Sequence, residues 1–290
     1  MLFDDFERQD DSPARYTEPH YTFLNRSARP NFVKVRDVLE EWFSHYPSGE
    51  APSLARRFRL TEDPQHSSAF FELFLHELLL RLECKAKIHP STRSAKSRRP
   101  DFLVRSHGGG AFYLEAVLAS GESTEEQAAR ARENVVYDVL DGLDSPNFFI
   151  NINVRGAPQT PPSARRIRQF LQMHLAELDP DDIAVLYQTG RQEGVPRWNF
   201  EHDGWRIEFS PLPKSRKARG KPGIRPIGMR SYGMKPAKAM SAIRDAIVSK
   251  GGRYGNVRLP YVIAINVLEL GVGRDEIMKR CSAMNKWRFN

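Results

Sequence analysis

The pattern of apolar and polar positions predicts a mixture of helices and strands. Apolar residues recur at helical spacing in six stretches, which are 31–45, a short one near Leu54, 67–82, 123–143, 163–178 and 236–249. Short apolar runs between turn residues predict strands at KAKIHP, PDFLVR, AFYLEAVLA and NFFININ, with SHGGG as a hairpin. Residues 1 to about 30 show little periodicity and predict an irregular arm.

The order of these elements predicts the fold class. Residues 67–153 read as helix, three strands, helix and strand, which is αβββαβ with a mixed sheet. A hairpin is predicted over Trp198–Phe209, and the apolar run LPYVIAINVL predicts a buried strand that extends the same sheet. We therefore expect an α/β core at 67–153, an N-terminal arm and helical extension at 1–66, and a C-terminal helix-strand addition within 154–290.

Composition narrows the class of protein. The chain has 290 residues of which 40% are hydrophobic, enough for a sizeable core. Its acidic opening does not resemble a signal peptide, and no run approaches the roughly 20 apolar residues of a membrane span. Cys84 and Cys281 lie far apart without CxxC spacing, which argues against a disulfide framework or a zinc site. We expect a cytoplasmic protein without a membrane partner.

Positive charge is concentrated in one segment. The formal net charge is +8, and residues 213–230 carry many basic side chains and no acidic one. Such a run creates a positive potential suited to phosphates, although a solvated loop would have the same composition. The residues predicted to bind nucleic acid are Lys214, Arg216, Lys217, Arg219, Lys221 and Arg225.

Two carboxylates stand out in adjacent predicted strands. Asp101 follows Pro100 at the head of one strand, and Glu115 lies within the next, 14 positions later across the glycine hairpin. Alternation places Glu115 on an apolar face, where a carboxylate is costly unless it is paired or bound to a metal. Mg²⁺ prefers oxygen ligands and keeps several waters, so two carboxylates suffice to hold it against a phosphate.

The Pro-Asp pair and the following Glu115-Ala116-Val117, in this order of elements, resemble the PD-(D/E)xK nuclease superfamily, whose fold is that of restriction endonucleases. The resemblance covers about residues 67–153. It implies that Asp101 and Glu115 bind Mg²⁺ or Mn²⁺ beside a scissile phosphate. The chain departs from the motif because Val117 stands where the family has lysine. The activating residues that remain open are Lys85, Lys87, Gln127 and Arg130.

Two further residues are candidates for the same site. Many members of the superfamily carry a glutamate on the first core helix that reaches the metal, and Glu72 matches that position. It is therefore expected as a third catalytic and metal-binding acid, with a helix-terminal glutamate at a partly exposed position as the alternative. His89 ends the first strand and could contact a phosphate, or it could cap a turn.

The function expected from these features is a Mg²⁺-dependent or Mn²⁺-dependent endonuclease that hydrolyses phosphodiester bonds, with DNA as substrate. One alternative is a catalytically inactive nucleic-acid-binding protein of the same fold. Another is an interaction subunit of a defence or mobile-element complex. A homodimer or protein partners are left open, as are sequence specificity and strandedness.

Overall fold

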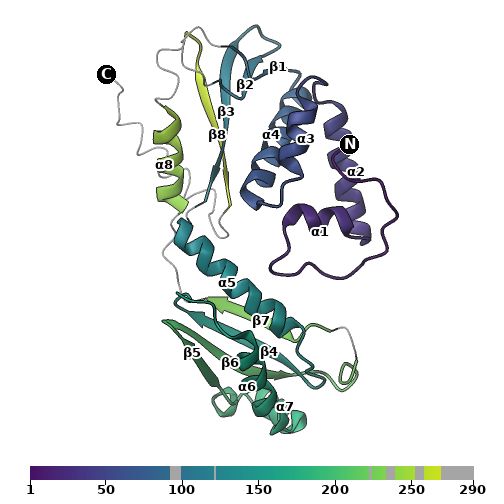
Figure 1. The fold of residues 1–290 in the computed structure, drawn as a ribbon, viewed down its shortest axis with the longest axis vertical. Coiled ribbons are helices and arrows are strands. Elements are labelled where there is room, and N and C mark those ends of the chain that lie inside the picture. The colour runs from purple at the N-terminus through teal and green to yellow at the C-terminus, as the bar shows by residue number, and fades with distance from the viewer. Residues whose placement is uncertain (92–98, 121, 222–223, 233–238, 252–257, 269–290) are drawn as a thin grey trace. The chain divides into compact units, whose positions relative to one another are not determined.

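The structure is a computed structural model that describes residues 1–91, 99–120, 122–221, 224–232, 239–251 and 258–268. The chain forms two units. Unit 1 is drawn from Met1–Ala14, Glu18–Gly121 and Ala237–Asn290, and unit 2 from Arg15–Thr17 and Glu122–Pro236. Each unit combines helices with a four-stranded mixed sheet, which confirms the α/β class (Figure 1).

The sheet of unit 1 is built from strands far apart in the sequence. Its strands are β1 (Lys85–Ile88), β2 (Phe102–Arg105), β3 (Ala111–Ala119) and β8 (Tyr261–Val267). In the order β1-β2-β3-β8, the first three strands are antiparallel neighbours and β8 is parallel to β3. The run LPYVIAINVL therefore extends the sheet, as predicted.

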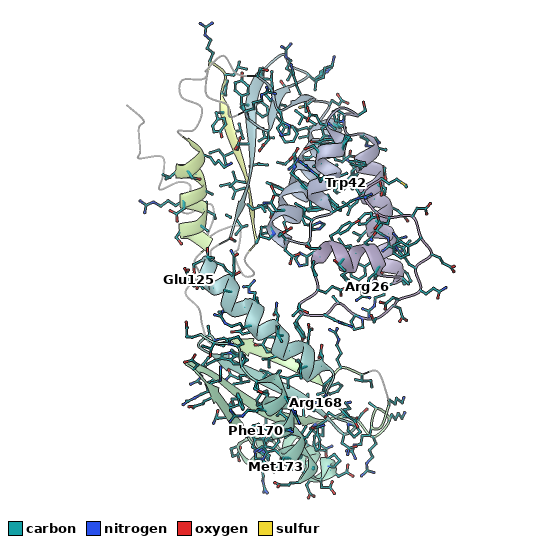
Figure 2. The ribbon with its side chains drawn as sticks, in the orientation of Figure 1. Arg26, Trp42, Glu125, Arg168, Phe170 and Met173 are labelled. Atoms are coloured by element: carbon teal, nitrogen blue, oxygen red, sulfur yellow. The ribbon has the colours of Figure 1, made fainter. Side chains whose placement is uncertain are left out.

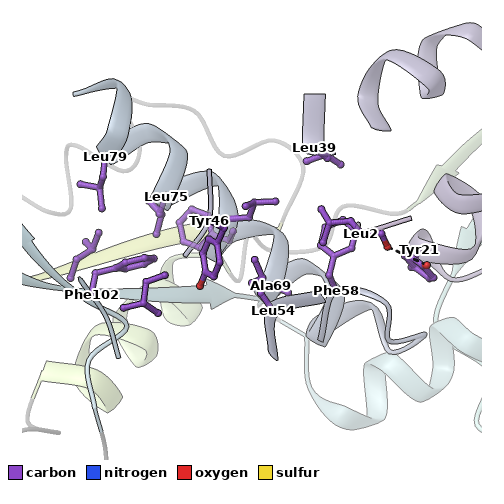
Figure 3. Packing of buried hydrophobic residues seen from close by; sticks show 14 of the residues in the cluster. Leu2, Tyr21, Leu39, Tyr46, Leu54, Phe58, Ala69, Leu75, Leu79 and Phe102 are labelled. Atoms are coloured by element: carbon purple, nitrogen blue, oxygen red, sulfur yellow. Dashed lines mark hydrogen bonds between the residues drawn. The ribbon is translucent and has the colours of Figure 1, made fainter. Parts of the chain in front are cut away.

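Helices cover both faces of this sheet. They are α1 (His20–Arg26), α2 (Pro30–Ser44), α3 (Ala51–Phe58), α4 (Asp63–Arg81) and α8 (Ala239–Gly251). Figure 3 shows Leu75 and Leu79 of α4 beside Phe102 of β2, in a core that α1, α2 and α3 also enter. On the other face, α8 packs Ile243 and Ala246 against strand residues that include Val117. One face thus belongs to the N-terminal helices and the other to α8.

The N-terminal region differs from the sequence prediction. Residues 1–30 are not an irregular arm, since they include α1 and bury Leu2 in the unit 1 core. The backbone N–H of Leu2 donates to the carboxylate of Glu40 at 2.7 Å, which fixes the start of the chain. Helix α4 begins at Asp63 rather than near residue 67, because Pro64 is tolerated in a first turn, where no N–H partner is needed.

Unit 2 has its own sheet and core. Its strands are β4 (Phe148–Arg155), β5 (Trp198–His202), β6 (Trp205–Pro213) and β7 (Ile227–Tyr232), and its helices are α5 (Thr124–Asp141), α6 (Ala164–Ala176), α7 (Pro180–Gln188) and the 3₁₀ turn η1 (Gln192–Gly194). In the order β5-β6-β4-β7, only the β4–β7 pair is parallel. The predicted β5–β6 hairpin is confirmed, and its turn has positive φ at Asp203 and Gly204.

The predicted fourth strand of the core is wrong. NFFININ forms β4, which pairs with β6 and β7 in unit 2 and not with the sheet that contains β3. Its inward residues Ile150 and Ile152 share a core with α5 and α6. Consequently the predicted boundary at 153–154 falls inside β4, and β8 is a strand of the unit 1 sheet with α8 packed on one of its faces. The element order within unit 1 is α4-β1-β2-β3-α8-β8.

Candidate active site: two carboxylates and a lysine on one sheet face

Asp101 and Glu115 lie on the same face of the unit 1 sheet. β2 and β3 pair Phe102 with Leu114, and continuing that antiparallel register by one residue places Asp101 opposite Glu115. The backbone N–H of Ala116 donates to Oδ2 of Asp101 at 2.7 Å, which ties the aspartate to the neighbouring strand. The predicted cross-strand pair is therefore brought together, because side chains opposite each other in a sheet share a face.

Burial makes this pair electrostatically costly. The Glu115 residue is only 2% exposed. Desolvation raises the pKa of Asp101 from 3.8 to about 6, and the negative charge of Glu115 is the second cause of that rise. The Ala116 N–H and the ammonium of Lys250 act in the opposite direction without cancelling it. A half-buried and a buried carboxylate on adjacent strands thus disfavour each other's charge, as paired acids in active sites do.

Lys250 is the functional candidate that sequence reasoning missed. It lies near the C-terminal end of α8, and its Nζ is 2.6 Å from Oε1 of Glu115. The helix was predicted over 236–249, one residue short of this lysine, and was assigned outside the core. The only sequence signal was a lysine closing a helix that precedes a buried strand, which is too common to single out.

Val117 stands on β3 at the position where the resembled motif has lysine. Val117 is 8% exposed and packs in the cluster formed with α8, on the same face as Glu115. A lysine there would place its stem among apolar side chains such as Ile243 and Ile263. The ammonium group of Lys250 reaches the face that carries Glu115 from helix α8.

Glu72 is buried on α4 and already has two partners. Its carboxylate accepts a hydrogen bond from the Tyr46 hydroxyl at 2.6 Å and pairs with the Arg57 guanidinium at 2.7 Å. Burial and the neighbouring Glu72 charge raise the pKa of the Tyr46 hydroxyl, so it remains a donor. Glu72 also contributes to the raised pKa of Asp101. It is thus close enough to act through its charge, while its oxygens are held by Tyr46 and Arg57.

The other candidates near the first strand have different surroundings. Lys85 and Lys87 are exposed on β1 at alternate positions. His89 follows β1 with a φ of 44°, and its backbone N–H donates to the carbonyl of Asp101 at 2.9 Å. Its ring Nδ1 is 3.4 Å from the Glu50 carboxylate. His89 therefore helps to fix the backbone of Asp101.

Gln127 and Arg130 belong to unit 2 because α5 does so. Both side chains are exposed, and Arg130 forms an ion pair with Glu122. Their candidacy depended on α5 being the second helix of the predicted core, and that position in unit 1 is filled by α8. The structure does not bring them together with the carboxylates within one unit.

The basic segment also lies in unit 2, and four of its six candidate residues have intramolecular partners. Buried Lys214 donates from Nζ to the carbonyl of Ser145 at 2.8 Å. The remaining charged contacts are Arg216 with Asp181 at 3.1 Å, Arg219 with Asp181 at 2.8 Å and Arg225 with Asp141 at 3.1 Å. Lys217 and Lys221 are exposed. Nucleic-acid binding by this segment stays a prediction.

Wider features of the described residues add little to the description of the site. Among the described residues, no group of three or more His, Cys, Asp or Glu side chains is arranged to hold a metal ion. None of the described helices has the length and apolar composition of a membrane span. Comparison with known proteins gave no matching family model, no curated relative and no similar solved structure. The function is therefore inferred from the geometry of the site.

Proposed function

We propose that unit 1 is a metal-dependent nuclease that hydrolyses phosphodiester bonds, with DNA as the expected substrate. Asp101 and Glu115 are its acidic residues, and Lys250 takes the role that the PD-(D/E)xK motif gives to its lysine. The observation that carries the proposal is the 2.6 Å contact between Lys250 Nζ and Glu115 Oε1, on the sheet face shared with Asp101. A lysine missing from the motif position is thereby supplied by another element.

The order of elements in unit 1 supports this proposal. Read without unit 2, the chain runs α4-β1-β2-β3-α8-β8, which is the αβββαβ order expected for a restriction-endonuclease-like core. β8 lies parallel to β3 after a helix, as the last strand of that core is expected to do. In this interpretation, residues 122–236 are an insertion between the third strand and the second helix.

The donor set fits a hard divalent cation. Asp101 and Glu115 offer carboxylate oxygens, which Mg²⁺ and Mn²⁺ prefer, and two such ligands suffice when waters complete the shell. Burial and the neighbouring Glu115 charge raise the pKa of Asp101, so a bound cation would favour its ionised form. When bound, such an ion supplies a water of lowered pKa and neutralises charge on the phosphate. Asp101 and Glu115 are the residues that would hold it.

The residues around these acids have distinct tasks. Lys250 fixes the orientation of Glu115 and presents a positive charge to an anionic substrate at the same face. The Ala116 N–H holds one oxygen of Asp101, which leaves the carboxylate in a defined orientation. Glu72 is a positioning residue rather than an assured ligand, since Tyr46 and Arg57 restrain it.

Cleavage of plasmid and single-stranded DNA with Mg²⁺ or Mn²⁺ tests the proposal. Asp101→Asn and Glu115→Gln should each lower the cleavage rate at least about 100-fold, because each removes a charged ligand while preserving side-chain volume. Nucleic-acid binding should persist in both variants. Cleavage that survives both substitutions would overturn the proposal. A wild-type protein that binds DNA but cuts none with either metal would favour the inactive binding protein.

A further inference from the structure

Helix α6 of unit 2 presents a polar, positively charged face to solvent. Its inward residues Ile167 and Leu171 are fully buried in the core under the sheet. The opposite side carries exposed residues spaced i, i+3, i+4 and i+7, which share one helix face. They are Arg165, Arg168, Gln169 and Gln172. Figure 2 labels Arg168 and Phe170 on this helix, and Phe170 packs against the unit 2 core.

Within the part of the chain that the structure describes, Arg165 and Arg168 have no ion-pair partners. The sequence of α6, ARRIRQFLQMHLA, contains no acidic residue. Among the described residues, neither the Arg165 nor the Arg168 side chain makes a hydrogen bond or an ion pair. The guanidinium groups of Arg216 and Arg219 in the basic segment, in contrast, share the carboxylate of Asp181. In unit 2, Arg165 and Arg168 of α6 therefore offer positive charge to a ligand outside the basic segment, in addition to the exposed Lys217 and Lys221.

This arrangement does not serve the stability of the helix. The N-terminal end of a helix favours negative side chains, yet Arg165 and Arg166 occupy the first turn. Arg165 and Arg168 are also neighbours on the helix surface and repel each other. Ser163 supplies the N-cap by accepting from the Arg166 N–H, so the arginines are not needed for capping. A bound anion would offset both unfavourable terms.

We propose that this face of α6 binds the phosphate backbone of a nucleic acid. Guanidinium groups match phosphate oxygens with two parallel hydrogen bonds, and the amides of Gln169 and Gln172 add donors to the same surface. A protein partner is less suited, because protein interfaces have an apolar centre and these four side chains provide none. The inference rests on the proposed function for the choice of nucleic acid as the ligand, and it assigns unit 2 a share of substrate binding.

The test is fluorescence anisotropy with a labelled DNA duplex of mixed sequence, in EDTA, between 50 and 200 mM KCl. The double variant Arg165→Gln with Arg168→Gln should weaken binding at least about tenfold and reduce the salt slope by about 2, since each phosphate contact contributes roughly 0.9. Arg197→Gln with Arg206→Gln, at exposed positions paired with Glu208 and Glu201, removes the same net charge and should change affinity less than about threefold. Lysine at both α6 positions should retain most of the binding.

Two outcomes would overturn the inference. One is an α6 double variant whose affinity and salt slope equal those of the wild type or of the control pair. The other is polyglutamate competing as well as DNA, which would indicate a surface for acidic proteins. Because binding is measured without divalent metal, a wild type that binds through α6 but never cleaves contradicts only the proposed function. A wild type that cleaves and whose binding ignores α6 contradicts only this inference.

Discussion

The carboxylate face of unit 1 and the basic segment of unit 2 use charge in opposite ways. In unit 1, buried Glu115 and half-buried Asp101 share one face, and the pKa of Asp101 rises to about 6. In the basic segment, Arg219 and Arg216 surround Asp181 and lower the pKa of its carboxyl. The carboxylate pair of unit 1 lowers the stability of the folded protein, whereas the ion pairs of Asp181 raise it. A carboxylate kept at such a cost is a candidate functional group.

Asp101→Asn should stabilise the protein at neutral pH. A pKa raised from 3.8 to about 6 corresponds to up to about 3 kcal/mol of unfavourable free energy for the ionised folded state. The asparagine has no charge to bury and keeps an oxygen for the Ala116 N–H. Urea unfolding at pH 7.5 should therefore show a gain of about 1–3 kcal/mol over the wild type.

The sign of the pH dependence follows from the raised pKa. Between about pH 4 and 6 the folded state retains a proton that the unfolded state has released. The advantage of Asp101→Asn should thus be complete above pH 6 and should fade as the pH drops toward 4. Asp11→Asn, at an exposed site, is the matched control for loss of a carboxylate, and its urea unfolding at pH 7.5 should stay close to that of the wild type. A destabilised Asp101→Asn at pH 7.5 would mean that Asp101 is a structural residue.

Asp181→Asn should have a smaller effect of opposite sign. Because the pKa of Asp181 is lowered in the folded state, its contribution is present above pH 4 and is lost as the pH falls below that range. The urea midpoint should fall slightly at pH 7 and low salt, and should match that of the wild type near pH 2 or at 1 M salt.

Asp182→Asn is the control for that experiment. Asp181 and Asp182 both lie in the first turn of α7, so their interactions with the helix dipole are similar. Only Asp181 pairs with Arg216 and Arg219. Equal midpoints for the two variants would show that the arginine pairs contribute nothing, and would remove the contrast with unit 1.

The sequence predicted local structure better than it predicted which sheet each strand joins. The periodicity that indicated α2, α5 and α6 is a property of short windows, and the structure confirms each helix. The alternation around Glu115 likewise predicted an apolar face for it, and Glu115 is buried. The strand NFFININ has the same apolar pattern whichever sheet it enters, so its assignment to the first sheet was wrong.

Lys250 could not be predicted because its partner is 135 positions away. Nothing local distinguishes it from exposed lysines such as Lys87. It became a candidate only when β8 was found parallel to β3, since that pairing lays α8 across the face of Glu115. The ion pairs of Arg216 and Arg219 could not be predicted either. Their partner, Asp181, lies outside the basic segment, which itself contains no acidic residue.

The most direct test of the account is the cleavage rate of Lys250→Met beside that of Lys87→Met. Loss of a group that stabilises charge in a reaction typically costs 100-fold or more, so Lys250→Met should cut DNA at least about 100-fold more slowly. The cleavage rate of Lys87→Met should stay within about twofold of the wild type. Lys250→Arg keeps a positive charge beside Glu115 and is the variant to measure if Lys250→Met does not fold. If Lys250→Met is folded and cleaves at the wild-type rate, the lysine has no catalytic role and the assignment of this site is contradicted.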